Sequence, residues 1–118
     1  MKTKQIDIEF TRGDTIPVNF TLLDAEGNVL ELKNGDELYA TVKKNYSDKT
    51  AIIQKKYTAG DITFEDGKYK FTFLASDTNT LQYGTYVMDI CLKSGDYVRT
   101  VAIGDITLTD EVTFVNNE

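Results

Sequence analysis

FLASDTNTLQYGTYVMDICL, residues 73–92, is the stretch that decides the fold. An apolar run ends at Leu74, a polar turn follows, and a long run with strand-like alternation begins after Gly84. Residues at every second position of an extended chain lie on one face. In this run that face is apolar, with Tyr86, Met88, Ile90 and Leu92. The stretch therefore predicts a strand, a corner at which the chain crosses between sheets, and a second, longer strand.

The corner itself has a recognisable spacing, Leu81-x-x-Gly84-x-Tyr86. It resembles the tyrosine corner of immunoglobulin-like sandwiches, in which a Tyr at the start of a late strand bonds back to upstream backbone. We predict architectural roles here, with Gly84 and Tyr86 forming the corner and Leu81 plugging the end of the sandwich. Residues 75–81 are the only expected helical piece, a single turn capped by Ser76 or Asp77.

The rest of the chain alternates apolar and polar residues in short runs, with turn signals about every eight to twelve residues. Asp66-Gly67 is the clearest tight hairpin. These signals predict an all-β, antiparallel, immunoglobulin-like β-sandwich of about seven to nine strands with at most one short helical turn. Its length of 118 residues fits a single domain spanning residues 1–118. We expect an ordered core over about residues 4–113, a short strand at 110–113 and fraying at 116–118.

The last long run changes parity within itself. Val101 and Ile103 share one parity, whereas Ile106 and Leu108 have the other. Gly104 lies at the switch, so the pattern predicts a β-bulge at Gly104. Four residues are thus assigned architectural roles: Leu81, Gly84, Tyr86 and Gly104.

Composition argues against several classes of function. The chain has no His, one Cys and a net charge of −6. We therefore expect no catalytic residues, no cofactor, no metal site and no nucleic-acid or membrane partner, and the protein is predicted not to be an enzyme. Cys91 is expected to be a buried, inert thiol. Asp89 has the parity opposite to its apolar neighbours, so it is expected to face solvent or to pair with a Lys or Arg99.

Three other motifs have ordinary explanations alongside functional ones. Arg12-Gly13-Asp14 spells an integrin-type tripeptide but is interpreted as a turn. Carboxylates at Asp24, Glu65 and Asp77 could ligate calcium at loop ends, although none matches an EF-hand loop. The aromatic residues could form a carbohydrate-stacking surface, for which an exposed aromatic row would be the sign. A carbohydrate- or calcium-binding module thus stays open as the alternative function.

Three segments together resemble a known group of proteins. They are RGDT leading to LLDAEG at residues 12–27, LKNGDELYATV at residues 32–42, and the run from Asp77 through Leu81, Gly84, Tyr86 and Ile90 to Val101, Gly104 and Val112. Their order resembles small β-sandwich structural proteins of phages and prophages of Gram-positive bacteria. It is also similar to the N-terminal domain of siphophage baseplate upper proteins.

The resemblance implies a non-enzymatic virion structural or accessory protein of a tail, baseplate or head, acting as a protein-docking module. Its implied partners are other virion proteins or further copies of itself as a homo-oligomer. The implied location is the host bacterial cytoplasm during assembly and then the virion, and the start of the sequence shows no signal peptide.

Overall fold

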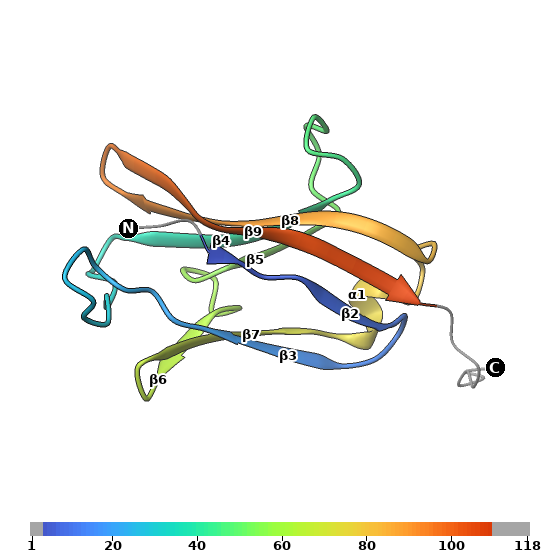
Figure 1. Ribbon diagram of the computed structural model, residues 1–118, viewed down its shortest axis with the longest axis horizontal. Coiled ribbons are helices and arrows are strands. Elements are labelled where there is room, and N and C mark those ends of the chain that lie inside the picture. Colours follow the sequence, from blue (N-terminus) through green and yellow to red (C-terminus); the bar gives the residue numbers. More distant parts are fainter. Residues whose placement is uncertain (1–3, 110–118) are drawn as a thin grey trace.

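A computed structural model describes residues 4–109 of the chain, which form two packed β-sheets (Figure 1). The expected strand at 110–113 and the fraying at 116–118 lie outside these residues. In chain order the elements are β1 (Lys4–Gln5), β2 (Ile8–Thr11), β3 (Ile16–Phe20), β4 (Glu37–Lys43), β5 (Ile53–Lys56), β6 (Thr63–Glu65), β7 (Lys68–Phe73), α1 (Ala75–Thr78), β8 (Gly84–Ser94) and β9 (Tyr97–Thr109). The predicted all-β sandwich with one short helical turn is confirmed.

The larger sheet has the strand order β1-β9-β8-β4-β5, and β2 also pairs with β9, further along the same edge as β1. The smaller sheet has the order β3-β7-β6. Most pairs are antiparallel, but β1 and β2 both run parallel to β9. The sandwich is thus mostly antiparallel, as predicted, and the first two strands are the exception. The chain crosses from β2 to β3 at residues 12–15 and so places consecutive strands in different sheets.

The core between the sheets consists mainly of apolar residues from the alternating runs that the sequence analysis identified as strands. Both long strands of the larger sheet contribute one dry face, and Ile90 and Leu38 are fully buried. Aromatic rings fill the space between: Phe10 of the larger sheet stacks on Phe73 of the smaller sheet with centroids 5.6 Å apart, and Phe20 stacks on Tyr69 within the smaller sheet at the same distance. Such ring pairs contribute about 0.5–1.5 kcal/mol each beyond the area they bury.

The local turn predictions follow the backbone. Asp66 and Gly67 have positive φ angles of 55° and 78°, which is the geometry of the tight hairpin between β6 and β7. The N-cap residue of α1 is Leu74, and Asp77, one of the two predicted capping residues, acts from the third helical position, where its carboxylate accepts a bond of 2.7 Å from the Leu74 amide. The same carboxylate forms an ion pair of 2.7 Å with Lys55, so it ties α1 to β5.

Gly104 does not form the predicted bulge. It pairs in register with Met88, whereas the register of β8 and β9 shifts between Ile90 and Cys91. Opposite that shift Val101 is the extra residue, and Val101 and Ala102 are both buried. The parity therefore switches three residues before the predicted position. Ile103, which follows, is exposed on the outer face.

Gly104 is required for a different reason. A Cβ atom there would lie 1.6 Å from the carbonyl oxygen of Ile6, a distance no side chain tolerates. The Ile6 backbone passes directly beside Gly104. The Ile6 amide donates to the Ile103 carbonyl at 2.8 Å, and the Asp7 carboxylate accepts a bond from the Asp105 amide at 3.0 Å. This close approach separates β1 from β2.

Candidate docking surface

The predicted corner is built around Tyr86, which is 4% exposed. Its hydroxyl donates to the carbonyl oxygen of Gln82 at 2.7 Å, four residues upstream. Gly84 has a φ of 140°, and the Lys44 ammonium lies 4.7 Å from the centroid of the Tyr86 ring. Gly84 and Tyr86 therefore set the direction in which β8 leaves the corner, and the Lys44 ammonium lies over the face of the Tyr86 ring.

The end of the sandwich beside the corner is closed by a network of backbone contacts. Leu81 is half-buried and packs against the core. Its carbonyl accepts a bond of 2.9 Å from the Arg12 guanidinium, and the buried Thr78 hydroxyl accepts one of 2.9 Å from the Gly13 amide. Because Arg12 is held in this way and lies 5.9 Å from the Tyr83 ring centroid, the tripeptide at 12–14 forms a structural turn.

At the opposite end, two residues that the sequence did not single out organise the long segment 21–36. The buried Tyr69 hydroxyl donates to the Leu30 carbonyl at 2.7 Å and accepts from the Leu32 amide at 3.0 Å, and burial raises the pKa of Tyr69. Asp36 accepts the Ser94 hydroxyl at 2.6 Å, and this bond holds the pKa of Asp36 below its usual value. Only the tertiary contacts distinguish these residues, because alternation marks Tyr69 like every other buried strand residue and Asp36 resembles any turn carboxylate.

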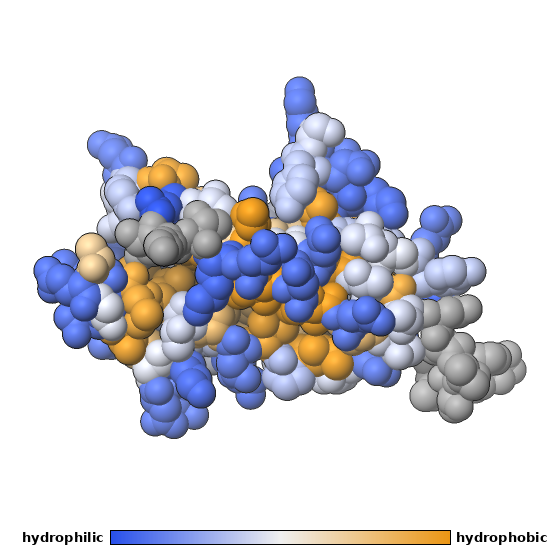
Figure 2. Space-filling view, viewed as in Figure 1, coloured by the Kyte–Doolittle hydropathy of each residue, from blue (hydrophilic) through white to orange (hydrophobic). Residues whose placement is uncertain are grey.

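A hollow of about 340 Å³ lies between this segment and the β8–β9 hairpin. Apolar atoms of Leu30, Leu32 and Tyr97 line it together with the carboxylates of Asp24 and Asp36. Tyr97 is more than half exposed. The hollow mixes apolar and charged groups in an open position at one end of the molecule. Figure 2 shows apolar side chains at this end and also between the two sheets.

The outer face of the six-stranded sheet carries the side chains that alternate with the buried residues of its strands. Val87, Asp89 and Cys91 project from β8 onto it, between the buried residues of that strand, and all three are half-buried. Ile103 pairs with Asp89 from the next strand and is 38% exposed. Ile52 and Val98 lie at its borders and are exposed too.

Cys91 was expected to be buried, and this prediction is wrong. The thiol belongs to the outer face and is half-buried there, beside Tyr39 on β4 and Thr100 on β9. Burial raises the pKa of the Cys91 thiol, so the neutral form is favoured at neutral pH. The parity of the strand was read correctly, but Cys91 falls on its other side.

Asp89 lies in the centre of this outer face. Partial burial raises the pKa of its carboxyl group, against a smaller lowering by Lys43 on the neighbouring strand. Thr41 on β4 and Ile103 on β9 are its direct cross-strand neighbours. Asp89 thus belongs to the outer face as expected, with Lys43 as the nearby cation, and Arg99 lies opposite Leu92 instead.

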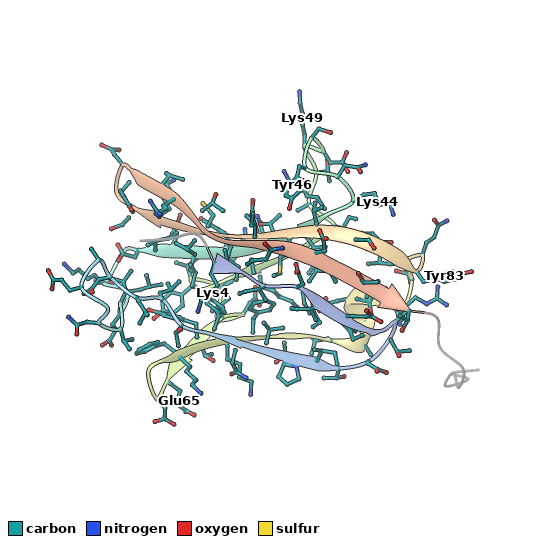
Figure 3. The ribbon with its side chains drawn as sticks, viewed as in Figure 1. Lys4, Lys44, Tyr46, Lys49, Glu65 and Tyr83 are labelled. Carbon is teal, nitrogen blue, oxygen red and sulfur yellow. The ribbon has the colours of Figure 1, made fainter. Side chains whose placement is uncertain are left out.

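Two projections flank this face. Loop 44–52 stands above the sheet between β4 and β5, and the β8–β9 hairpin bends upward at the other end (Figure 1). Tyr46 and Lys49 lie on the projecting loop (Figure 3). The loop is folded by its own bonds, since the Asn45 amide donates to the Asp48 carboxylate at 3.0 Å and the Asp48 amide donates to the Asn45 carbonyl at 3.1 Å.

The outer face of the smaller sheet has a different character. Lys68, Lys70 and Thr72 project from β7, and Asn19 and Pro17 project from β3. The two lysines and both β3 residues are exposed. This face is polar, so the two outer faces of the sandwich differ.

Two of the three loop carboxylates considered as calcium ligands, Asp24 and Asp77, are engaged in local structure. Asp24 accepts the amides of Glu26 and Asn28, both at 2.9 Å, and Asp77 is bound to Lys55. Within residues 4–109 there is no group of three acidic, His or Cys residues suited to hold a metal ion. The exposed tyrosines of the same residues lie apart: Tyr46 in loop 44–52, Tyr83 just before β8 and Tyr97 at the start of β9.

Within the same described range, no helix is long and apolar enough to cross a membrane. Comparison with known protein families and with curated proteins found no match for this chain.

Proposed function

We propose that this chain is a non-enzymatic docking module, a structural or accessory protein of a phage or prophage virion. The observation that carries the proposal is the outer face of the six-stranded sheet, where Val87 and Cys91 are half-buried and Ile103 is exposed without a covering element among the described residues. Exposed apolar residues bordered by polar ones are typical of protein-binding surfaces. The resemblance of the sequence to small virion β-sandwiches supplies the biological setting.

The sheet edges support docking through a face instead of through an added strand. β6 has only three residues, and β3 contains Pro17, which has no amide hydrogen to donate. On β5 both backbone groups of Lys56 are already bonded: the Asp61 amide donates to the Lys56 carbonyl at 3.0 Å, and the Lys56 amide donates to the Asp61 carboxylate at 3.1 Å. Edges that are short, capped or proline-bearing are poor templates for a further strand.

The alternative is a carbohydrate- or calcium-binding module. A row of exposed aromatic rings would favour sugar binding, but Tyr46 and Tyr83 lie on different parts of the molecule in Figure 3. The loop carboxylates favour turn formation, as Asp24 shows. We therefore give the docking module precedence.

The test uses particles from the native host. A photo-crosslinking amino acid replaces Ile103 on the outer face, or Asn19 on the smaller sheet as the matched control, and particles are separated by sedimentation. The expected result is that the chain sediments with virion particles and that only position 103 crosslinks to a structural protein. A chain found solely in the soluble fraction would contradict the virion role.

A further inference from the structure

Charge is distributed unevenly across the outer face of the six-stranded sheet. At one side, on β2 and β9, the exposed residues include Glu9 and Asp105, with Asp7 beside them. We call these three residues the acidic edge. Lys4, on β1 at the same edge, donates to the Thr21 hydroxyl at 3.1 Å, and a chain with a net charge of −6 adds to the negative field of the acidic edge.

The other side of the same face is basic at one end of β4, whereas Glu37 at the other end accepts the Tyr39 hydroxyl. Lys43 projects from β4 onto the face, Lys56 projects from β5, and Lys49 is exposed on loop 44–52. We call Lys43 and Lys49 the basic corner. The register shows the polarity directly, because Lys43, Val87 and Asp105 are Cα partners in one row across β4, β8 and β9. In this row a positive end, an apolar centre and a negative end therefore succeed one another, and Asp89 lies on the same face two residues further along β8.

We propose that the outer face of the six-stranded sheet binds a second copy of this chain, with the acidic edge of each copy against the basic corner of the other. A two-fold axis lying in the interface over β8 exchanges the two sides of the face. Such an isologous contact pairs residue i with residue j and residue j with residue i, so both ion-pair sets form at once. Val87 lies near the axis and contributes apolar contact at the centre.

The projecting loop fits this arrangement. Because loop 44–52 stands above the face, two copies cannot lie flat over their whole length (Figure 3). Instead the loop of each copy lies beside the edge of the other, which brings Lys49 towards Glu9. The internal bonds between Asn45 and Asp48 hold the loop in place before binding, so little ordering is required.

The size of the face sets the strength of the contact. Five strand positions about 4.8 Å apart and about seven residues of 3.3 Å each give a face of roughly 550 Å² per copy. Two such faces are at the low end of specific protein interfaces. The dimer is therefore a weak, salt-sensitive one, as exposed charge pairs are screened by salt.

The inference rests on the proposed docking function and names its partner. It is tested by light scattering on the purified full chain across a concentration series at low and high salt. The expected result is a mass rising towards two chains at low salt and falling with added salt. A mass of one chain throughout the series would overturn the inference.

Charge reversal tests the surface itself. Lys43→Glu with Lys49→Glu, and separately Glu9→Lys with Asp105→Lys, are each expected to weaken the dimer at least about tenfold through like-charge repulsion. An equimolar mixture of the two variants is expected to recover a dimer containing one chain of each. Failure of the mixture to associate would overturn the proposed pairing.

A control variant separates local pairing from net charge. Lys68→Glu with Lys70→Glu changes the net charge by the same amount as the basic-corner variant but lies on the smaller sheet. It is expected to dimerise as the wild type does, and equal weakening would overturn the assignment of the face. Circular dichroism melting checks that every variant is folded. If the purified chain is a monomer but still sediments with virion particles, only the dimer inference is overturned. If the chain forms the dimer but is absent from particles, only the virion role is contradicted.

Discussion

Gly104→Ala is the substitution for which the structure gives the sharpest expectation. In an ordinary strand this change stabilises the fold by about 0.4–1 kcal/mol, because alanine has fewer unfolded conformations to lose than glycine. Here the new Cβ would lie 1.6 Å from the Ile6 carbonyl oxygen and 2.5 Å from its carbonyl carbon. The close atoms belong to the backbone, so the crossing strand must move away. The two effects have opposite signs.

The cost follows from what the displaced strand loses. Two hydrogen bonds attach it beside Gly104, from the Ile6 amide at 2.8 Å and to the Asp7 carboxylate at 3.0 Å. At about 1 kcal/mol for each bond, and about 1 kcal/mol for the half-buried Ile6 side chain, Gly104→Ala should lower the free energy of unfolding by about 3 kcal/mol. For a chain of this size that corresponds to a melting temperature about 12 °C lower.

The assay is urea unfolding followed by circular dichroism, in two backgrounds. In the full chain Gly104→Ala is expected to be strongly destabilising. In a chain that starts at Ile8 the Ile6 carbonyl is absent, so the same substitution should be neutral or stabilising. Thr107→Ala, on the outer face of the same strand, serves as the control. Equal stability of Gly104→Ala and wild type in the full chain would refute the reasoning.

Three further predictions concern other parts of the fold. Tyr86→Phe should lower the free energy of unfolding by about 1 kcal/mol in urea titrations, because it removes the corner hydrogen bond, and no loss would refute the corner. Burial raises the pKa of Asp89, so the folded chain keeps that proton to higher pH than the unfolded chain and stability falls as pH rises from 3.8 through the raised value. Asp89→Asn should therefore raise the melting midpoint near pH 7 and leave it unchanged near pH 3, and equal shifts at both would contradict this assignment. Lys55→Met should cost about 1–3 kcal/mol by leaving Asp77 without its ion pair, whereas the exposed Lys56→Met should be nearly neutral in the same denaturation assay.

Local sequence pattern predicted the strands well because a strand has a period of two. The buried residues of β8, with Met88 and Ile90 among them, are those whose parity the sequence marked. Ile52 and Ile53 separate into an exposed and a buried residue as their alternation predicts. The Asp66–Gly67 hairpin followed from the chemistry of two adjacent residues. In each case the information lies within a few residues of chain.

The same alternation misplaced two features of the outer face. The parity switch in β9 lies at Val101 and not at Gly104, because a bulge requires no glycine when both residues at the switch can be buried. Cys91 was assigned to the core from the apolar character of its strand, although its parity puts it with Asp89. Here the composition of the run was less informative than its period.

The sequence by itself determined most of the buried residues, where the chain turns and that the fold is a β-sandwich, because these depend on short-range periodicity and turn chemistry. Only the tertiary structure decided that β1 and β2 run parallel to β9, which joins Ile8 to a partner nearly a hundred residues away. The contact between Ile6 and Gly104 and the row from Lys43 through Val87 to Asp105 arise from that pairing. Their partners are distant in sequence and are brought together by packing, which no local pattern encodes.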